Sequence, residues 1–185
     1  MKLRLSVAAL VLAPLAAHAT VYQQILPEQS RIRFNYQQMG VDMDGAFTSF
    51  NGDFYFDTDA PEQSKVELQL ALSSVDTGLA EADAELEKSE WFNSAAYPQA
   101  IFRAETITSN GPSRYQVQGQ LEIKGQQQAV NFDAVLNTDG EHATLVGQLP
   151  IKRGDFHIGE GPWANFDVVA NEVTIDFSIA VAPAN

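Results

Sequence analysis

The 185-residue chain contains no cysteine. This absence excludes disulfide bonds, thiolate nucleophiles and cysteine-bound metals together. Basic residues are also scarce, because 11 lysines and arginines stand against 24 aspartates and glutamates, which gives a formal net charge of -13. A chain this acidic repels phosphate groups, so we expect it to bind neither nucleic acid nor anionic membrane surfaces.

Histidine is also rare, with three residues in the whole chain. His18 lies near the N-terminus, His142 follows a turn-like sequence, and His157 follows an aromatic residue as a candidate pH-sensitive gate. The sequence has no His-x-x-x-His pair, nucleophile elbow or phosphate-binding glycine loop. We therefore expect no enzymatic activity, no catalytic cofactor and no metal site. A hydrolase that uses two carboxylates is the enzymatic alternative.

The chain has one long apolar run, at its N-terminus, and this run is too short to cross a bilayer. A basic start over residues 1–4 precedes the apolar stretch 5–15, and a small-x-small cleavage sequence follows at 17–19. This order predicts a secretion signal over residues 1–19 and a single mature domain over 20–185, located in the periplasm of a bacterial cell. An uncleaved anchor or a buried first strand is the alternative.

Alternation of apolar and polar residues dominates the rest of the chain. Val66–Leu72 shows it most clearly, and residues 115–123, 130–134 and 173–179 repeat it. Turn-forming residues such as Asn110–Pro112 separate these runs. Many short strands with turns between them predict an all-β antiparallel sandwich or barrel.

One segment, Leu79–Tyr97, breaks the alternation. It is rich in helix-forming residues, and Leu79, Ala82 and Leu86 are spaced to share one helical face. Thr77 is the expected N-cap of this helix. The pattern therefore predicts one helical insertion in a β domain.

The apolar faces of the expected strands carry many phenylalanines and long aliphatic residues. Such faces either fill a solid core or line a closed barrel of about eight strands with room for one ligand, and alternation alone fits both. With a filled core, the protein would be an interaction module whose acidic helix docks on a quinone-linked membrane partner. An outer-membrane barrel is disfavoured by the short strands and by their polar alternate positions.

Several segments, in order along the chain, carry a resemblance to a known family. They are Ser30–Phe34, Gly45–Phe54, Ser73–Gly78, Ser89–Phe92, Tyr97–Phe102, Tyr115–Gly125, Ile151–Gly159 and Glu172–Ile175. Together they resemble the YceI-like family of periplasmic polyisoprenoid-binding proteins over essentially the whole mature chain. The sequence departs from the family pattern at Glu85, where members often carry histidine, and at His157, which replaces a glycine.

The resemblance implies an extended, antiparallel, lipocalin-like β-barrel with a short helical insertion, often dimeric. It also implies a hydrophobic tunnel that holds a long apolar isoprenoid lipid of the quinone or polyprenyl type. We therefore expect a carrier whose partners are this lipid, a transient membrane partner and a second copy of the chain.

The candidate ligand-binding residues come from the inward faces, the helical insertion and the glycine-rich loop that holds the second tryptophan. They are Ile32, Phe34, Phe47, Phe54, Leu68, Leu70, Trp91, Phe92, Phe102, Leu121, Phe132, Ile151, Phe156 and Trp163. Arg153 and Asp155 are expected to form an ion pair near an opening, as a surface pair of little energetic worth.

Overall fold

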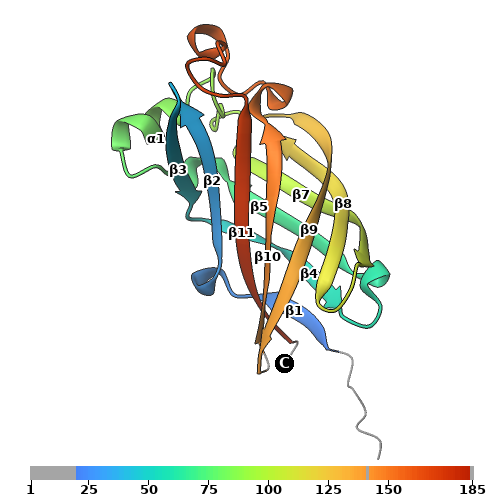
Figure 1. Ribbon diagram of the computed structural model, residues 1–185. Coiled ribbons are helices and arrows are strands. Elements are labelled where there is room, and N and C mark those ends of the chain that lie inside the picture. The colour runs from blue at the N-terminus through green and yellow to red at the C-terminus, as the bar shows by residue number, and fades with distance from the viewer. Residues whose placement is uncertain (1–19, 141, 184–185) are drawn as a thin grey trace, which may run out of the picture.

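The computed structural model describes residues 20–140 and 142–183, so the predicted secretion signal over residues 1–19 lies outside the described residues. Eleven strands and one short α-helix, α1 (Ala80–Leu86), make up this part of the chain (Figure 1). The strands are β1 (Val21–Ile25), β2 (Arg31–Gln38), β3 (Val41–Phe47), β4 (Phe50–Asp57), β5 (Lys65–Ala71), β6 (Val75–Asp76), β7 (Gln99–Ser109), β8 (Arg114–Ile123), β9 (Gln126–Asp139), β10 (His142–Lys152) and β11 (Glu172–Pro183).

Eight of the strands close into a ring. Their order is β1-β4-β5-β7-β8-β9-β10-β11, and the ring closes because β1 pairs with both β4 and β11. Tyr22 marks the closure, since it is paired with Phe56 on one side and with Pro183 on the other. The named strand pairings are all antiparallel. The predicted all-β antiparallel barrel of about eight strands is therefore confirmed.

Strand β11 extends the barrel beyond this ring. One edge of β11 pairs with β10, and its other edge pairs with two different strands along its length. The C-terminal part of β11 pairs with β1, and its N-terminal part pairs with β2 between Thr174 and Ser178. Ser30 lies at the changeover, where its hydroxyl donates to the Leu26 carbonyl and accepts from the Ala180 N–H. Strands β2, β3 and β6 then continue the wall past the point where β1 ends.

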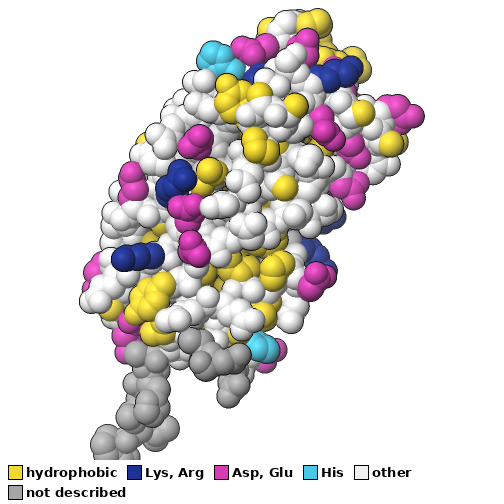
Figure 2. All heavy atoms as spheres, turned by 180° about the vertical axis from the view of Figure 1, so that it is seen from behind, with side chains coloured by type: hydrophobic (Ala, Val, Ile, Leu, Met, Phe, Trp, Pro, Cys, Tyr) yellow, Lys and Arg dark blue, Asp and Glu magenta, His cyan; other side chains and the backbone are white. Residues whose placement is uncertain are grey.

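The regions of clearest alternation coincide with strands. Val66–Leu72 corresponds to β5, and the other three alternating runs lie within β8, β9 and β11. Their inward residues form two clusters of buried side chains, one at each end of the barrel. The outer surface carries the charge, and Figure 2 shows acidic side chains spread over one face with few basic ones between them.

The helical insertion is shorter than predicted, because α1 ends at Leu86 and turns fill the chain up to Pro98. Thr77 is not its N-cap, so that prediction was wrong. The N-cap position is held by Leu79, two residues after Thr77. The Thr77 backbone N–H and hydroxyl instead donate to the Asp83 carboxylate, at 2.8 and 2.7 Å. Leu79 itself is 58% exposed and leaves the apolar face to Ala82 and Leu86. Among the described residues, no helix is both long and apolar enough to span a membrane.

Candidate functional site

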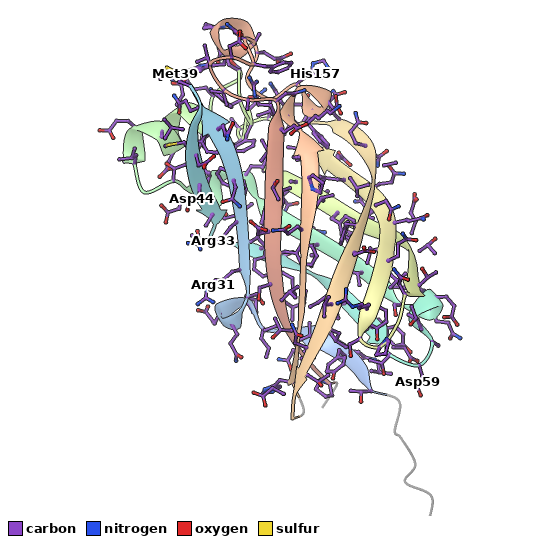
Figure 3. All side chains as sticks on the ribbon, viewed as in Figure 1. Arg31, Arg33, Met39, Asp44, Asp59 and His157 are labelled. Carbon is purple, nitrogen blue, oxygen red and sulfur yellow. The ribbon has the colours of Figure 1, made fainter. Side chains whose placement is uncertain are left out.

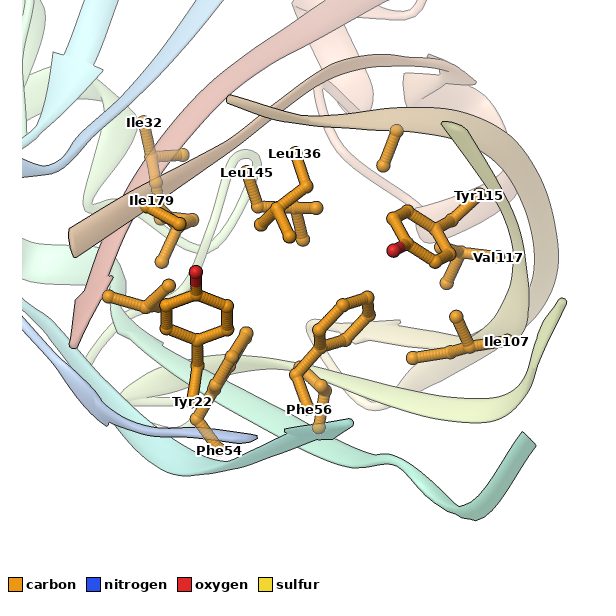
Figure 4. Close-up of a cluster of buried hydrophobic side chains, with 14 of the residues drawn as sticks. Tyr22, Ile32, Phe54, Phe56, Ile107, Tyr115, Val117, Leu136, Leu145 and Ile179 are labelled. Carbon is orange, nitrogen blue, oxygen red and sulfur yellow. The ribbon is translucent and has the colours of Figure 1, made fainter. Parts of the chain in front are cut away.

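The barrel interior contains two cavities, and we call the one at the end where β1 lies the lower cavity. It measures about 110 Å³, and none of the side chains that line it is exposed on the outer surface. Side chains of the buried cluster around it, including Phe54, Phe56, Tyr115 and Leu145, point from opposite walls toward a common interior (Figure 4). Burial raises the pKa of the Tyr115 hydroxyl above its usual value.

The second, upper cavity measures about 430 Å³ and lies beneath α1. This volume falls in the range of roughly 300–1,000 Å³ that is typical of small-molecule sites. Its walls are mainly apolar, but Gln38, Glu81 and Glu85 also line it. Because Glu81 is exposed at the surface, the upper cavity reaches solvent between α1 and the end of β2.

The two cavities adjoin each other through the middle of the barrel. Leu70, Ala100, Leu121 and Ile175 line both of them. These four residues come from β5, β7, β8 and β11, so the boundary between the cavities is set by strands on opposite sides of the barrel. The interior therefore holds two adjacent apolar chambers, one wide and one narrow, and we call the two together the tunnel.

Aromatic rings line the tunnel along much of its length. In the upper chamber the Phe47 ring lies 5.5 Å from that of Phe34 and 5.8 Å from that of Phe92, measured between centroids. In the lower chamber Phe132 lies 5.6 Å from Phe102 and 5.4 Å from Phe177. Such tilted and edge-on pairs hold rings in fixed orientations, so the walls are preorganised rather than collapsed.

Two segments cover the upper cavity, and together we call them the cap: residues 77–98 between β6 and β7, and residues 153–171 between β10 and β11. Met39 at the tip of the β2–β3 hairpin and His157 in the cap lie at this end of the molecule, with Asp59 at the other (Figure 3). The two cap segments are joined where the N–H groups of Gly159 and Glu160 both donate to the Glu90 carbonyl, at 2.7 and 2.8 Å.

Arg153 organises the second cap segment from inside. Its side chain is 2% exposed, and all five of its N–H bonds donate to backbone carbonyls. The acceptors are the carbonyls of Ile158, Gly159, Trp163, Val169 and Ala170, at 2.7 to 3.1 Å. The predicted surface ion pair with Asp155 was therefore wrong, because the surrounding loop already satisfies the whole guanidinium group. Burial lowers the pKa of Arg153 from its usual value.

The close fit around Arg153 explains a glycine in the cap. Gly159 has a φ of +76°, and a Cβ atom at this position would lie 2.2 Å from Arg153 Nη1. Any larger residue would therefore combine backbone strain with a direct clash. The loop can wrap the guanidinium group only with glycine at position 159.

Glu85, Trp91 and Trp163 form a polar group in the otherwise apolar upper cavity. Trp163 Nε1 donates to the Glu85 carboxylate at 3.1 Å, and the two indole rings lie 5.4 Å apart. Hydrogen bonding from Lys88 is the main cause of a lowered pKa at Glu85, and the indole of Trp163 adds to it. The Trp91 N–H also lowers this pKa, yet it does not reach hydrogen-bonding geometry with Glu85 or any other described residue.

The structure places thirteen of the fourteen candidate ligand-binding residues on the tunnel walls. The upper cavity is lined by Phe34, Phe47, Trp91, Phe92, Ile151 and Trp163, the lower by Ile32, Phe54, Leu68, Phe102 and Phe132, and both by Leu70 and Leu121. Phe156 is 1% exposed and packs in the upper core cluster without lining either cavity. Sequence reasoning missed Ile158 and Val169, which also line the upper cavity from irregular segments without alternation. Leu72, at the end of the alternating run Val66–Leu72, lines the upper cavity as well and was not among the candidates.

His157, the candidate gate, does not line the tunnel. Its side chain is 58% exposed, and its Nδ1 atom lies 3.0 Å from Glu160 Oε1. The same glutamate accepts a hydrogen bond from Lys124, whose ammonium group is 8% exposed and also donates to the His157 carbonyl. His157 therefore belongs to the outer surface of the cap.

Comparison with known proteins places this architecture in a family. The model of the YceI-like domain matches residues 23–181. A UPF0312 protein of Photorhabdus laumondii is 33% identical over 170 residues, which cover 86% of this chain and 88% of the relative.

Two solved structures are similar as well. The crystal structure of Burkholderia cenocepacia BcnA superposes with a TM-score of 0.82 at 31% identity and covers 85% of this chain and 99% of BcnA. A polyisoprenoid binding domain from Saccharophagus degradans, implicated in plant cell wall breakdown, shares the fold with a TM-score of 0.69 at 15% identity, covering 90% of this chain and 100% of that domain.

Proposed function

The chain belongs to the YceI-like family, and on this premise we propose that it is a carrier that holds one long apolar lipid, a polyisoprenoid, in its tunnel. The observation that carries the proposal is the apolar interior of the barrel, in which two adjacent chambers share the wall residues Leu70, Ala100, Leu121 and Ile175. A filled-core interaction module would have no use for such a space. The binding of polyisoprenoid by the Saccharophagus degradans domain supports the choice of ligand class.

Binding of this kind requires burial of apolar surface and little else. Each methylene-sized group that leaves water contributes roughly 0.8 kcal/mol, before the costs of ordering the ligand. The thirteen candidate residues on the tunnel walls supply aromatic and aliphatic contacts along its length. We propose these residues as the ligand-binding set and Phe156 as a support behind them.

The same walls argue for binding without chemistry. Neither His142 nor His157 lines the tunnel, and the guanidinium group of Arg153 is committed to backbone carbonyls. Of the two carboxylates that line the upper cavity, Glu85 is engaged by Trp163 and Lys88, and Glu81 lies exposed at the surface. We propose that the protein is not an enzyme and needs no catalytic cofactor.

The location and the partners of the protein are also proposals. The predicted secretion signal over residues 1–19 and the predicted mature domain over 20–185 support a periplasmic carrier, and the resemblance to the family supports a homodimer. Met39 and Leu79 are 72% and 58% exposed, and they lie within two residues of Gln38 and Glu81, which line the upper cavity. These apolar side chains would favour a transient contact with a membrane partner during lipid exchange.

The test is native mass spectrometry of the full chain purified from a bacterial periplasm, followed by organic extraction and identification of the ligand. We expect one isoprenoid molecule for each chain, of the quinone or polyprenyl type. The mass of the protein itself reports whether the mature chain begins at Thr20. Protein that arrives empty and takes up no added isoprenoid would contradict the carrier function.

A further inference from the structure

Trp91 carries an unused hydrogen-bond donor inside the candidate site. The side chain is 7% exposed and lines the upper cavity, and its Nε1 atom is buried without a partner among the described residues. Buried N–H groups in folded proteins nearly always find a partner, because an unpaired one costs free energy of desolvation. This donor therefore points to an acceptor on the ligand.

The other strong donors beside Trp91 are already committed. The Trp163 indole donates to Glu85. The guanidinium group of Arg153 lies 5.8 Å from the Trp91 ring, and all five of its N–H bonds donate to backbone carbonyls. One N–H suits a single neutral oxygen, whereas a phosphate needs several donors or a free cation.

The carboxylates on the same cavity wall act against an anionic ligand. Glu85 and Glu81 both line the upper cavity. Glu85 is paired with Lys88, so the nearby ammonium group is already engaged. Arg153 also lines this cavity, but five backbone carbonyls surround its guanidinium group, so a second negative charge at this wall would find no free donor there and would be repelled by Glu85 and Glu81.

We propose that Trp91 Nε1 and Glu85 form a head-group subsite that selects lipids with one neutral acceptor oxygen and rejects phosphorylated ones. This inference rests on the proposed lipid-binding function and adds the chemical class of the head group. A carbonyl or hydroxyl oxygen accepts from the Trp91 N–H, and the apolar tail fills the tunnel.

The test compares three ligands that share one tail: geranylgeraniol, the corresponding hydrocarbon, and geranylgeranyl phosphate. Dissociation constants are measured on the delipidated full chain by native mass spectrometry. The alcohol should bind about threefold to tenfold tighter than the hydrocarbon, as one hydrogen bond predicts. The phosphate should bind more weakly than the alcohol.

Three variants separate the contributions. Trp91→Phe should abolish the advantage of the alcohol over the hydrocarbon, and Glu85→Gln should reduce the penalty on the phosphate. Phe92→Leu is the matched control, because it removes apolar wall atoms only and should weaken all three ligands by similar factors.

A spectroscopic measurement on the unmodified protein does not depend on variant folding. The chain has two tryptophans, so its NMR spectrum contains two indole N–H signals, which Trp163→Phe assigns. Geranylgeraniol should shift the Trp91 signal downfield relative to the hydrocarbon complex. Equal affinities for all three ligands, or tightest binding of the phosphate, would overturn the head-group assignment alone, whereas failure of all three to bind would overturn the carrier function with it.

Discussion

Trp163 donates a hydrogen bond to Glu85 over a distance of 3.1 Å, and this contact joins residues 78 positions apart in the sequence. It links the two segments of the cap directly across the upper cavity. A second link runs through the Glu90 carbonyl, which accepts from Gly159 and Glu160. The cap is thus held by few polar contacts above a large apolar space, and we predict that these contacts restrain the release of a bound lipid.

The first prediction concerns the rate of release. Trp163→Phe keeps an aromatic ring in the cavity wall but removes the hydrogen bond to Glu85. The bond is one of the few that join the two cap segments, so we expect lipid dissociation to accelerate several-fold in this variant. Stopped-flow transfer of a fluorescent isoprenoid to vesicles measures the rate. Val41→Ala, at an exposed position, serves as the control, and an equal rate in all three proteins would show that the contact does not restrain the cap.

The second prediction concerns Arg153. Arg153→Met leaves five backbone carbonyls without their donor in a buried loop, so we expect a loss of about 3–5 kcal/mol in the free energy of unfolding. Urea denaturation of the lipid-free protein measures it. Arg153→Lys should fall between the two, because lysine offers three donors instead of five. The exposed Arg114→Met is the control, and comparable losses at both positions would refute the role of the carbonyl cradle.

The third prediction concerns the passage between the chambers. Ala100→Phe places a ring where the two cavities adjoin, so a long tail can no longer occupy the lower chamber. Affinity for geranylgeraniol should fall by about tenfold or more, because several methylene-sized groups lose their burial, while geraniol should be affected much less. Thr108→Leu, on an exposed position of the same strand, controls for the added bulk. A uniform loss for both ligands would contradict a two-chamber tunnel.

The fourth prediction concerns pH. Hydrogen bonds from Lys124, and then from His157, hold the pKa of Glu160 below its usual value of 4.5. A carboxylate whose pKa is lowered by folding stabilises the folded state above its unfolded pKa, and this contribution disappears as the pH falls through the folded value. The unmodified protein should therefore lose more stability between pH 7 and about pH 4 than Glu160→Gln. Urea midpoints at both pH values measure the difference, with the exposed Glu62→Gln as control; parallel losses in all three would exclude the linkage.

The sequence predicts a strand well where one face of the strand is exposed to solvent and the other face is apolar. A shift of one residue in the pairing register of β5 or β8 would turn every apolar side chain outward. Alternation therefore defines both the strand and its inward face. The residues that line the tunnel follow from the same rule, because Ile32, Phe34, Phe102 and Phe132 lie on such strands. For inward-facing residues on strands, the alternating pattern alone predicts which side chains line the tunnel.

The cap could not be predicted in this way. Arg153 and Asp155 are close in sequence and opposite in charge, which suggested an ion pair, but the acceptors of Arg153 are carbonyls supplied by backbone folding over the next 17 positions. The hydroxyl of Thr77 could cap a helix, but Thr77 lies two residues before the N-cap position, Leu79. Phe156 is buried like the wall residues and differs from them only in three-dimensional placement. Each of these depends on loop geometry, which sequence periodicity does not encode.

The unequal size of the two chambers gives the tunnel a direction. In the proposed carrier, the flexible end of a linear lipid would reach the smaller chamber past Ala100, so the tail would enter first and leave last. A recipient of the lipid would then meet the head group before any of the hydrocarbon is exposed to water.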